Sequence, residues 1–182
     1  MEVIKTAIDG VLIIEPRIFE DARGYFFESF SQREFNEDVS PITFVQENES
    51  CSSKYVVRGL HYQNPPFSQS KLVRCVKGSM ISLALDLRRG SSTYGKCLQT
   101  ELSEGNRLFE FIPHGFAHGF LVLSQEAVFT YKVDRPYAPQ AEAGIRWNDP
   151  DLTIEWPIDP GQVQTSAKDL VQPLFKDAEL FD

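Results

Sequence analysis

The stretch from Val57 to Val76, VRGLHYQNPPFSQSKLVRCV, places charged and titratable side chains inside two apolar runs. The first run contains Arg58 and His61, and the second contains Lys71, with a Pro-Pro loop between them. Apolar runs bounded by Gly and Pro are typical of strands, so these three side chains belong to strand bodies, where apolar residues would pack better. Buried polar groups destabilise a fold unless they have partners. One such strand would indicate a solvated sheet face, but three groups of mixed type indicate a ligand site.

The sequence contains three histidines, His61, His114 and His118, which raises a metal site as an alternative. Two histidines spaced HxH on one strand point to the same face, and β-barrel metal sites usually use that arrangement. Here Tyr62 and Gln63 follow His61, so the HxH pair is missing and we expect no metal. We interpret His114, between Pro and Gly in a turn, as a surface residue. His118, within FAHGFLVL, is either a partnered core histidine or a ligand contact.

Two further residues have a structural interpretation when each is taken alone. Asp169 lies in SAKD at the expected start of the last helix, where the helix dipole favours an acid. Tyr131 lies in the apolar run VFTYKV, where a half-buried tyrosine is common in a strand. The sequence has no GxGxxG after a strand, no P-loop and no GxSxG. Rossmann, P-loop NTPase and serine-hydrolase functions therefore lack support.

The composition is that of an ordinary globular protein, with 182 residues of which 42% are hydrophobic and 24% charged. A formal net charge of -8 disfavours a nucleic-acid binder, which normally has a basic face. It leaves room for a small phosphorylated ligand bound by a few local Arg and Lys. The three cysteines are widely spaced without CxxC, which indicates reduced thiols in a cytoplasmic protein. The N-terminal MEVIKTAIDG lacks the apolar run of a signal peptide, and no segment approaches the ~20 apolar residues of a membrane span.

A β fold must position these side chains. Apolar or alternating runs recur at the roughly 8–12-residue spacing of a sandwich or barrel, and we expect about ten short strands. Besides the two in the opening stretch, they fall within residues 3–14, 25–30, 43–46, 79–87, 94–102, 108–112, 116–123 and 127–133. Ser31 and Glu34 predict a capped helix over residues 32–39 with Phe35 buried, and residues 166–174 predict a C-terminal helix. Because no long amphipathic helix separates the strands, one all-β domain over residues 1–182 fits better than an α/β fold.

A family resemblance rests on seven segments in order: RGLHYQ, QSKLVRCVKG, LDLRRGSSTYGK, FIPHGFAHGF, YKVDRPYAP, GIRWNDPDLTIEWP and SAKD. With them the chain closely resembles the dTDP-4-dehydrorhamnose 3,5-epimerase family, from about the first strand to the last helix. The resemblance implies a jelly-roll (cupin-like) β-sandwich and a cytoplasmic homodimer that exchanges N-terminal strands. It implies a nucleoside-diphospho-4-keto-6-deoxyglucose as substrate, on the route to activated L-rhamnose, and neither a metal nor an organic cofactor. One departure is Ser82 in SMISLALD, where many members carry Asp.

The same resemblance implies a role for each site residue. His61 is the expected general base, Tyr131 the general acid and Asp169 the partner of His61. The residues implied to line the sugar and the keto oxygen are Lys71, Arg58 and His118. The residues implied to bind the nucleotide or shape the pocket are Arg23, Phe26, Glu28, Gln46, Asn48, Tyr137, Glu142 and Lys168. Of these, residues 23, 26 and 28 are expected to act partly across the dimer interface.

The implied reaction needs these residue types. A 4-keto group makes the protons on C3 and C5 acidic, because the carbanion delocalises into an enolate. Histidine suits their removal, since its pKa lies near 7, and a carboxylate such as Asp169 on the far ring nitrogen fixes the tautomer and stabilises the imidazolium. Lys71 can stabilise the enolate oxygen. Tyr131 is a weak acid that can return a proton to the opposite face of the sugar.

Three alternatives stay open on the sequence. A 3-epimerase or a 5-epimerase acting on a related nucleotide sugar could use the same base and acid. An inert cupin-like sugar-binding protein would have no need for His61, Asp169, Lys71 and Tyr131 together. A metal-dependent cupin dioxygenase is disfavoured by the missing HxH pair. The motifs identify neither the nucleoside base nor which of C3 and C5 is inverted.

Overall fold

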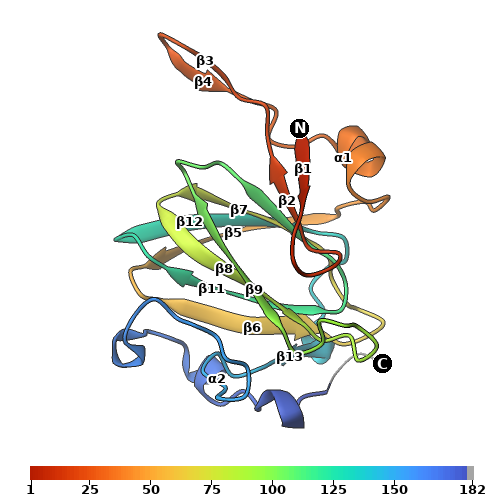
Figure 1. Cartoon of the computed structure of the whole chain (residues 1–182), viewed down its shortest axis with the longest axis vertical. Helices are drawn as coiled ribbons and strands as arrows, with labels where there is room; N and C mark the ends of the chain where they lie inside the picture. Colours follow the sequence, from red (N-terminus) through yellow and green to blue (C-terminus); the bar gives the residue numbers. More distant parts are fainter. Residues whose placement is uncertain (180–182) are drawn as a thin grey trace.

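Two antiparallel sheets face each other in a computed structural model, which describes residues 1–179 (Figure 1). The six-stranded sheet has the order β1 (Glu2–Lys5), β2 (Leu12–Glu15), β10 (Phe109–Ile112), β7 (Lys71–Lys77), β12 (Glu126–Val133), β5 (Gln46–Ser53). The five-stranded sheet has the order β13 (Glu142–Gly144), β6 (Val57–Gln63), β11 (Phe116–Val122), β8 (Ser79–Asp86), β9 (Cys97–Ser103). The hairpin of β3 (Phe19–Asp21) and β4 (Gly24–Phe26) is separate from both sheets. The prediction of an all-β sandwich is confirmed.

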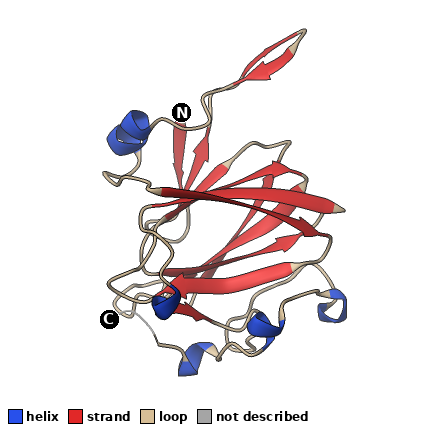
Figure 2. Cartoon of the chain, turned by 180° about the vertical axis from the view of Figure 1, so that it is seen from behind, coloured by secondary structure: helices blue, strands red, loops and turns tan. Residues whose placement is uncertain are grey.

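Helices are few and short, and Figure 2 shows most of them around the edges of the sheets. They are α1 (Gln32–Asp38), α2 (Ala167–Leu170) and the 3-10 segments η1 (Pro139–Ala141), η2 (Pro160–Gln162) and η3 (Phe175–Asp177). Ser31 caps α1 by accepting the Glu34 N–H at 3.4 Å, and Phe35 is its buried residue, as predicted. Within residues 1–179, no helix is long and apolar enough to cross a membrane.

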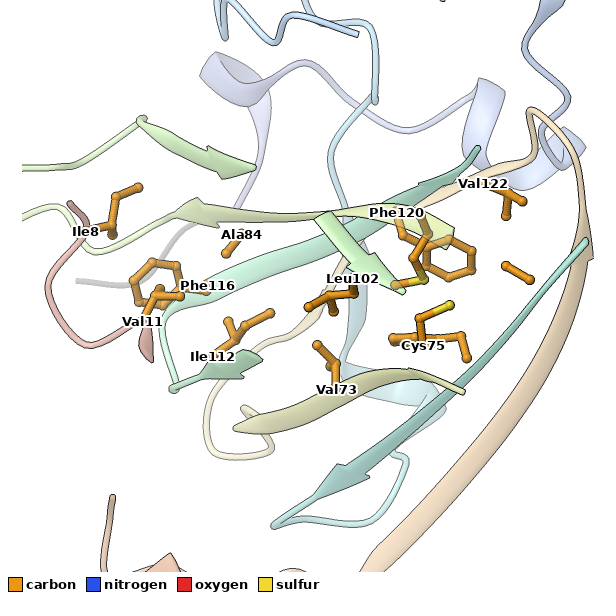
Figure 3. Packing of buried hydrophobic residues seen from close by; sticks show 13 residues of the cluster. Ile8, Val11, Val73, Cys75, Ala84, Leu102, Ile112, Phe116, Phe120 and Val122 are labelled. Carbon is orange, nitrogen blue, oxygen red and sulfur yellow. The ribbon is translucent and has the colours of Figure 1, made fainter. Parts of the chain in front are cut away.

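The space between the sheets is filled by side chains that alternate along the strands. Val73 and Cys75 of β7 point into the same interior as Leu102 of β9 and Phe120 of β11, and all four are buried (Figure 3). Burying an apolar side chain of this size contributes roughly 1.5–3 kcal/mol. This interior fixes the register of both sheets, because a slip by one residue would turn each apolar set outward.

The outer face of the five-stranded sheet is covered by the chain after β13. Leu83 and Leu85 of β8 point outward and pack with Ile145 and Leu152 from that segment. Since both faces of β8 are buried, its sequence is apolar beyond the simple alternation of a half-exposed strand. The covering segment then leads the chain back to β6, where α2 lies.

Two predicted strands differ from the observed ones at their ends. The strand predicted over residues 25–30 ends at Phe26, because Phe30 turns inward and packs on Phe35, with ring centroids 6.2 Å apart. The strand predicted over residues 43–46 instead begins at Gln46 and continues through the polar QENESCSS. That strand, β5, is an edge strand paired only with β12, so one of its faces can remain polar.

Two other predicted elements are shorter than expected. The strand predicted from Tyr94 begins at Cys97, because the chain turns at Gly95, where φ is +74°. The helix predicted over residues 166–174 contains only Ala167–Leu170. Pro173 disfavours a helical conformation at the residue before it, so the helix ends early.

Candidate active site

A cavity of about 250 Å³ opens between the ends of the two sheets and gathers seven of the fourteen predicted site residues. β6 and β13 of one sheet and β5, β7 and β12 of the other contribute side chains to it. Its lining residues are Gln46, Asn48, His61, Tyr62, Gln63, Gln69, Lys71, Tyr131, Tyr137 and Glu142. The polar groups that sequence alone distributes over five strands therefore meet in one place.

His61 and Asp169 form a hydrogen-bonded pair at the edge of this cavity. His61 Nε2 lies 2.6 Å from Asp169 Oδ1, and the Asp169 side chain is buried while that of His61 is one-third exposed. The Ser166 hydroxyl accepts the Asp169 N–H, and Gly59 donates its N–H to Asp169 Oδ2 at 3.4 Å. Burial alone would raise the pKa of Asp169. The hydrogen bond and charge of His61, with the bonds from Gly59 and Ser166, lower that pKa below its ordinary value, so the carboxylate stays ionised.

Gly59 explains how β6 presents His61 beside β11. Its φ of +121° is in the region that favours glycine, and a Cβ there would lie 2.6 Å from Gly119 Cα and 2.8 Å from the His118 carbonyl oxygen. The two strands therefore approach closely at this point, and their register shifts between His118 and Phe120. The shift places His61 directly opposite His118.

Lys71 and Tyr131 come from adjacent strands of the other sheet. Lys71 Nζ lies 6.0 Å from the centroid of the Tyr131 ring. Burial lowers the pKa of Lys71 to about 8, so Lys71 loses its proton at a lower pH than an exposed lysine does. Burial also raises the pKa of Tyr131, against a hydrogen bond from Asn48 and the charge of Arg58. A cation and a phenol thus lie across the cavity from the His61 strand.

His118 is a partnered core histidine. It is 6% exposed, is not among the lining residues, and its Nε2 lies 3.1 Å from Ser82 Oγ. Its ring stacks on Phe129 at 5.7 Å between centroids. Desolvation, together with the charges of Lys71 and His61, lowers the pKa of His118 well below its ordinary value, so the ring is neutral.

The rim of the cavity is a network of predicted binding residues. Glu142 Oε2 accepts the Tyr137 hydroxyl at 2.8 Å and pairs with Lys168 Nζ at 2.5 Å. Gln46 accepts the Tyr137 N–H at 3.2 Å and donates to Asn48 at 2.8 Å. Hydrogen bonds and one ion pair, with the Tyr137 backbone N–H among the donors, therefore hold these five residues in place.

Arg58 is not among the residues that line the main cavity. With His61, Lys168 and Asp169 it lines a second hollow of about 370 Å³. Its Nε donates to Ser52 Oγ at 3.0 Å, which fixes the guanidinium beside β5. His61 is therefore accessible from two hollows, one beside Lys71 and one beside Arg58.

Three predicted binding residues lie away from this site within the chain. Arg23 pairs with Asp21 at 2.5 Å on the β3–β4 hairpin, and Phe26 lies on the same hairpin. Phe26 and Glu28 line a different cavity of about 420 Å³ beside α1. His114, predicted to be a surface residue, has a side chain that is 39% exposed, and its Nε2 bonds Asp134 Oδ2 at 2.7 Å, which anchors the turn.

Other residues of the site were missed by sequence reasoning. Gln63 and Gln69 line the cavity, and Gln63 also accepts the Ala138 N–H at 2.8 Å, which fixes the loop before η1. Glu110 is fully buried behind His118. A single acid inside the apolar run FEFI was a signal for it. Among residues 1–179, no group of three or more His, Cys, Asp or Glu side chains could hold a metal ion.

The family model for dTDP-4-dehydrorhamnose 3,5-epimerase matches residues 5–177. The chain belongs to the dTDP-4-dehydrorhamnose 3,5-epimerase family. The epimerase from Shigella flexneri is 49% identical over 182 residues, which cover 100% of this chain and 99% of that protein. The crystal structure of the epimerase from Elizabethkingia anophelis is similar with a TM-score of 0.92, 46% identity and coverage of 97% of both chains. The structure of the Legionella pneumophila epimerase in complex with dTDP-4-keto-L-rhamnose has a TM-score of 0.92 and 44% identity, over 96% of this chain and 93% of that one.

These matches confirm the resemblance inferred from the motifs. The epimerase is an isomerase with dTDP-4-dehydrorhamnose 3,5-epimerase activity, and its sandwich is the fold of its structural relatives. The chain is therefore neither an inert sugar-binding protein nor a cupin dioxygenase.

Proposed function

We propose that this epimerase converts dTDP-4-dehydro-6-deoxyglucose to dTDP-4-dehydro-L-rhamnose, with His61 as base and Tyr131 as acid. The observation that carries the proposal is the His61–Asp169 pair, 2.6 Å between Nε2 and Oδ1, beside a cavity that also contains Lys71 and Tyr131. The dTDP-4-keto-L-rhamnose in the similar Legionella structure supports this class of substrate.

The tautomer of His61 follows from its partner. An ionised Asp169 can only accept a hydrogen bond, so neutral His61 carries its proton on Nε2 and its lone pair on Nδ1. Nδ1 is then the atom that removes a proton from C3 or C5. The resulting imidazolium is stabilised by the carboxylate, which stays ionised throughout. General base catalysis of this kind typically contributes about 10²–10⁴-fold.

Lys71 stabilises the enolate that forms when the carbon proton leaves. Its ammonium is half-buried on β7, where water screens its charge less than at the surface. A fixed cation beside the 4-keto oxygen stabilises the negative charge as it develops in the transition state. His118, neutral and next to Lys71, adds no second positive charge there.

Tyr131 supplies the proton that completes inversion. It belongs to β12 of the six-stranded sheet, whereas His61 belongs to β6 of the five-stranded sheet. A sugar between the two sheets therefore meets base and acid on different faces. Removal of a proton on one face and its return on the other inverts the carbon, and the same pair can act on C3 and then on C5.

The nucleotide is bound at the rim and, we propose, by a second copy of the chain. The β3–β4 hairpin projects away from the sandwich (Figure 1), with Phe26 70% and Tyr25 55% exposed. Exposed aromatic side chains on an extended hairpin favour an interaction surface. A homodimer in which this hairpin covers the partner's cavity would bring Arg23, Phe26 and Glu28 to the nucleotide of the other subunit.

The chemistry assigned to these side chains requires neither a metal nor an organic cofactor. Enolate stabilisation is assigned to Lys71, and both proton transfers are assigned to His61 and Tyr131. The match over residues 5–177 supports one epimerase domain spanning residues 1–182. The three free cysteines and the family membership support a cytoplasmic location.

The test is incubation of the parent protein with dTDP-4-keto-6-deoxyglucose in D₂O, with and without EDTA, followed by NMR of the sugar. We expect deuterium at both C3 and C5, inversion of both carbons, and the same rate with EDTA. Exchange and inversion at one carbon alone would instead indicate a 3-epimerase or a 5-epimerase. Loss of turnover with EDTA that zinc or manganese restores would contradict the assignment to Lys71.

A further inference from the structure

A carboxylic acid lies in the apolar interior behind the active site. Glu110 belongs to β10, is 0% exposed, and is flanked along the strand by the buried Phe109 and Phe111. Its neighbours in register on β2 and β7 are Ile13 and Val73, which are apolar. A buried acid costs stability unless it is hydrogen-bonded, and an apolar residue would pack here without that cost. Its presence therefore calls for a function.

The partners of Glu110 come from the facing sheet and lead to His118. Ser82 Oγ donates to Glu110 Oε2 at 2.5 Å, and Thr100 Oγ1 donates to Glu110 Oε1 at 2.9 Å. The same Ser82 Oγ lies 3.1 Å from His118 Nε2. Glu110, Ser82 and His118 thus form a buried chain of hydrogen bonds that crosses the sandwich, here named the Glu110–Ser82–His118 chain.

The direction of these bonds depends on the charge of Glu110. A serine hydroxyl has one proton to donate. When Glu110 is ionised, that proton is committed to Oε2, so Ser82 Oγ must accept from His118, which places the imidazole proton on Nε2 and the lone pair on Nδ1. Without an acceptor at Glu110, the Ser82 hydroxyl donates to His118 Nε2, and the imidazole proton moves to Nδ1.

We propose that Glu110 is a positioning residue for the epimerisation, which acts through the Ser82 hydroxyl to hold His118 as a neutral imidazole with its proton on Nε2. The inference rests on the proposed function, because it concerns how His118 lies beside Lys71 and His61 during enolate formation. An Nδ1 lone pair can accept a hydrogen bond from the Lys71 ammonium, whereas an Nδ1–H would repel that cation. Ser82 carries no charge of its own, so the carboxylate of the chain comes from Glu110 on the facing sheet.

The ionisation of Glu110 sets the pH at which this arrangement exists. Burial raises the pKa of Glu110 to about 7, against the hydrogen bonds from Ser82 and Thr100, so the carboxylate is ionised above about pH 7. The charged or titratable groups facing the other end of the chain are Lys71 of β7 and His61 of β6, and both disfavour a charge on His118. A measurement at pH 8 therefore examines ionised Glu110 beside neutral His118.

The first test is the tautomer of His118 in the full-length parent protein at pH 8. With only three histidines, ¹⁵N-histidine labelling and long-range ¹H–¹⁵N NMR resolve each ring, and His61→Gln and His114→Gln assign them. We expect His118 as the neutral Nε2–H tautomer. An Nδ1–H tautomer or an imidazolium in the parent would overturn the proposal without any variant at Glu110.

The second test removes the carboxylate and then restores it elsewhere. Glu110→Met should convert His118 to the Nδ1–H tautomer and lower turnover by about 10- to 100-fold, the effect typical of groups that orient a functional histidine around metal sites, with KM little changed. The double variant Ser82→Asp with Glu110→Met returns a carboxylate to His118 and should restore the Nε2–H tautomer and most of the turnover. Thr100→Val is the matched control, because it removes the bond to the other carboxylate oxygen and should leave the tautomer unchanged.

The outcomes separate a positioning role from a packing role. One outcome is that Glu110→Met folds and keeps both the Nε2–H tautomer and the parent turnover. In that case Glu110 serves only to accept hydrogen bonds from the Ser82 and Thr100 hydroxyls, and the proposal is wrong. If Glu110→Met does not fold, Ser82→Ala gives the same test, because it cuts the chain while leaving Glu110 in place, and unchanged turnover there would contradict the proposal. If the parent protein does not exchange the C3 and C5 protons for deuterium, the proposed function is wrong. The tautomer of His118 is measured without substrate, so its result does not depend on that outcome.

Discussion

His61 and Asp169 are 108 residues apart in the sequence, and their side chains are 2.6 Å apart between Nε2 and Oδ1. The segment that covers the outer face of the five-stranded sheet brings α2 back to β6 and makes the contact. The Ser166 hydroxyl accepts the Asp169 backbone N–H, and Gly59 donates its N–H to the Asp169 carboxylate. The orientation of His61 is therefore fixed by the fold before any substrate binds.

Replacement of the carboxylate should impair catalysis while leaving the fold intact. In Asp169→Asn an amide can donate to His61 Nε2 and so select the wrong tautomer, and it cannot stabilise the imidazolium. We expect turnover to fall by about 10²–10⁴-fold with a similar melting temperature. The matched control is Asp134→Asn, which alters a His–Asp pair of 2.7 Å outside the cavity and should change turnover little. Equal losses in both variants would mean that the pair at His61 is only structural.

Local sequence patterns identify polar side chains that interrupt apolar strands. Arg58, His61 and Lys71 are polar residues in apolar strands, and they were found for that reason. Asp169 has a sufficient local explanation as a helix-start acid, so only the family resemblance linked it to His61. The contact across 108 residues leaves no trace in local periodicity.

Tertiary contacts also explain what the patterns missed in the fold. Beyond Gln46 the polar β5 was not predicted as a strand, because its strand character comes from pairing with β12 and not from its own side chains. Glu110 interrupts an apolar run, but its partners Ser82 and Thr100 lie on the facing sheet, and only the packed sandwich shows that they meet.

Activity should decline at alkaline pH as Lys71 loses its charge. The pKa of Lys71 is lowered by burial to about 8, so the side chain is a cation below this pH and neutral above it. Since only the cation stabilises an enolate, kcat/KM should fall as pH rises through about 8. In Lys71→Arg the guanidinium stays charged, so this alkaline limb should disappear whatever the absolute rate. An identical limb in parent and variant would show that another group titrates there.

The ionisation of Glu110 should make the free energy of unfolding depend on pH. Its pKa is about 7 in the folded protein and near 4.5 in an unfolded chain, so between these pH values the folded state binds more protons. Stability from this group is present in full below about pH 4.5 and is lost as pH rises to about 7, by about 3 kcal/mol in total. Urea unfolding at pH 4.5 and pH 8 should show this loss in the parent relative to Glu110→Gln. A constant difference between the two proteins would contradict the assignment.

The protein should be a dimer held together in part by the β3–β4 hairpin. Light scattering at micromolar concentration should give twice the mass of the chain, and Phe26→Asp should weaken association by more than about tenfold, the effect of losing a well-packed aromatic at an interface. Val171→Asp is the matched control, because Val171 is 77% exposed and lies outside the hairpin. A monomeric parent, or equal effects of both substitutions, would contradict this use of the hairpin.

The most direct test of the separate roles of His61 as base and Tyr131 as acid uses one NMR sample of each variant in D₂O. Deuterium uptake and sugar configuration are both measured in that sample. With His61→Ala, neither C3 nor C5 should exchange and no product should form. With Tyr131→Phe, His61 can still remove a proton and return it to the original face, so exchange should persist while inversion slows by at least about 10²-fold. Inversion of both carbons at nearly the parent rate by Tyr131→Phe would show that Tyr131 only packs in the site. Exchange by His61→Ala would contradict the assignment of the base.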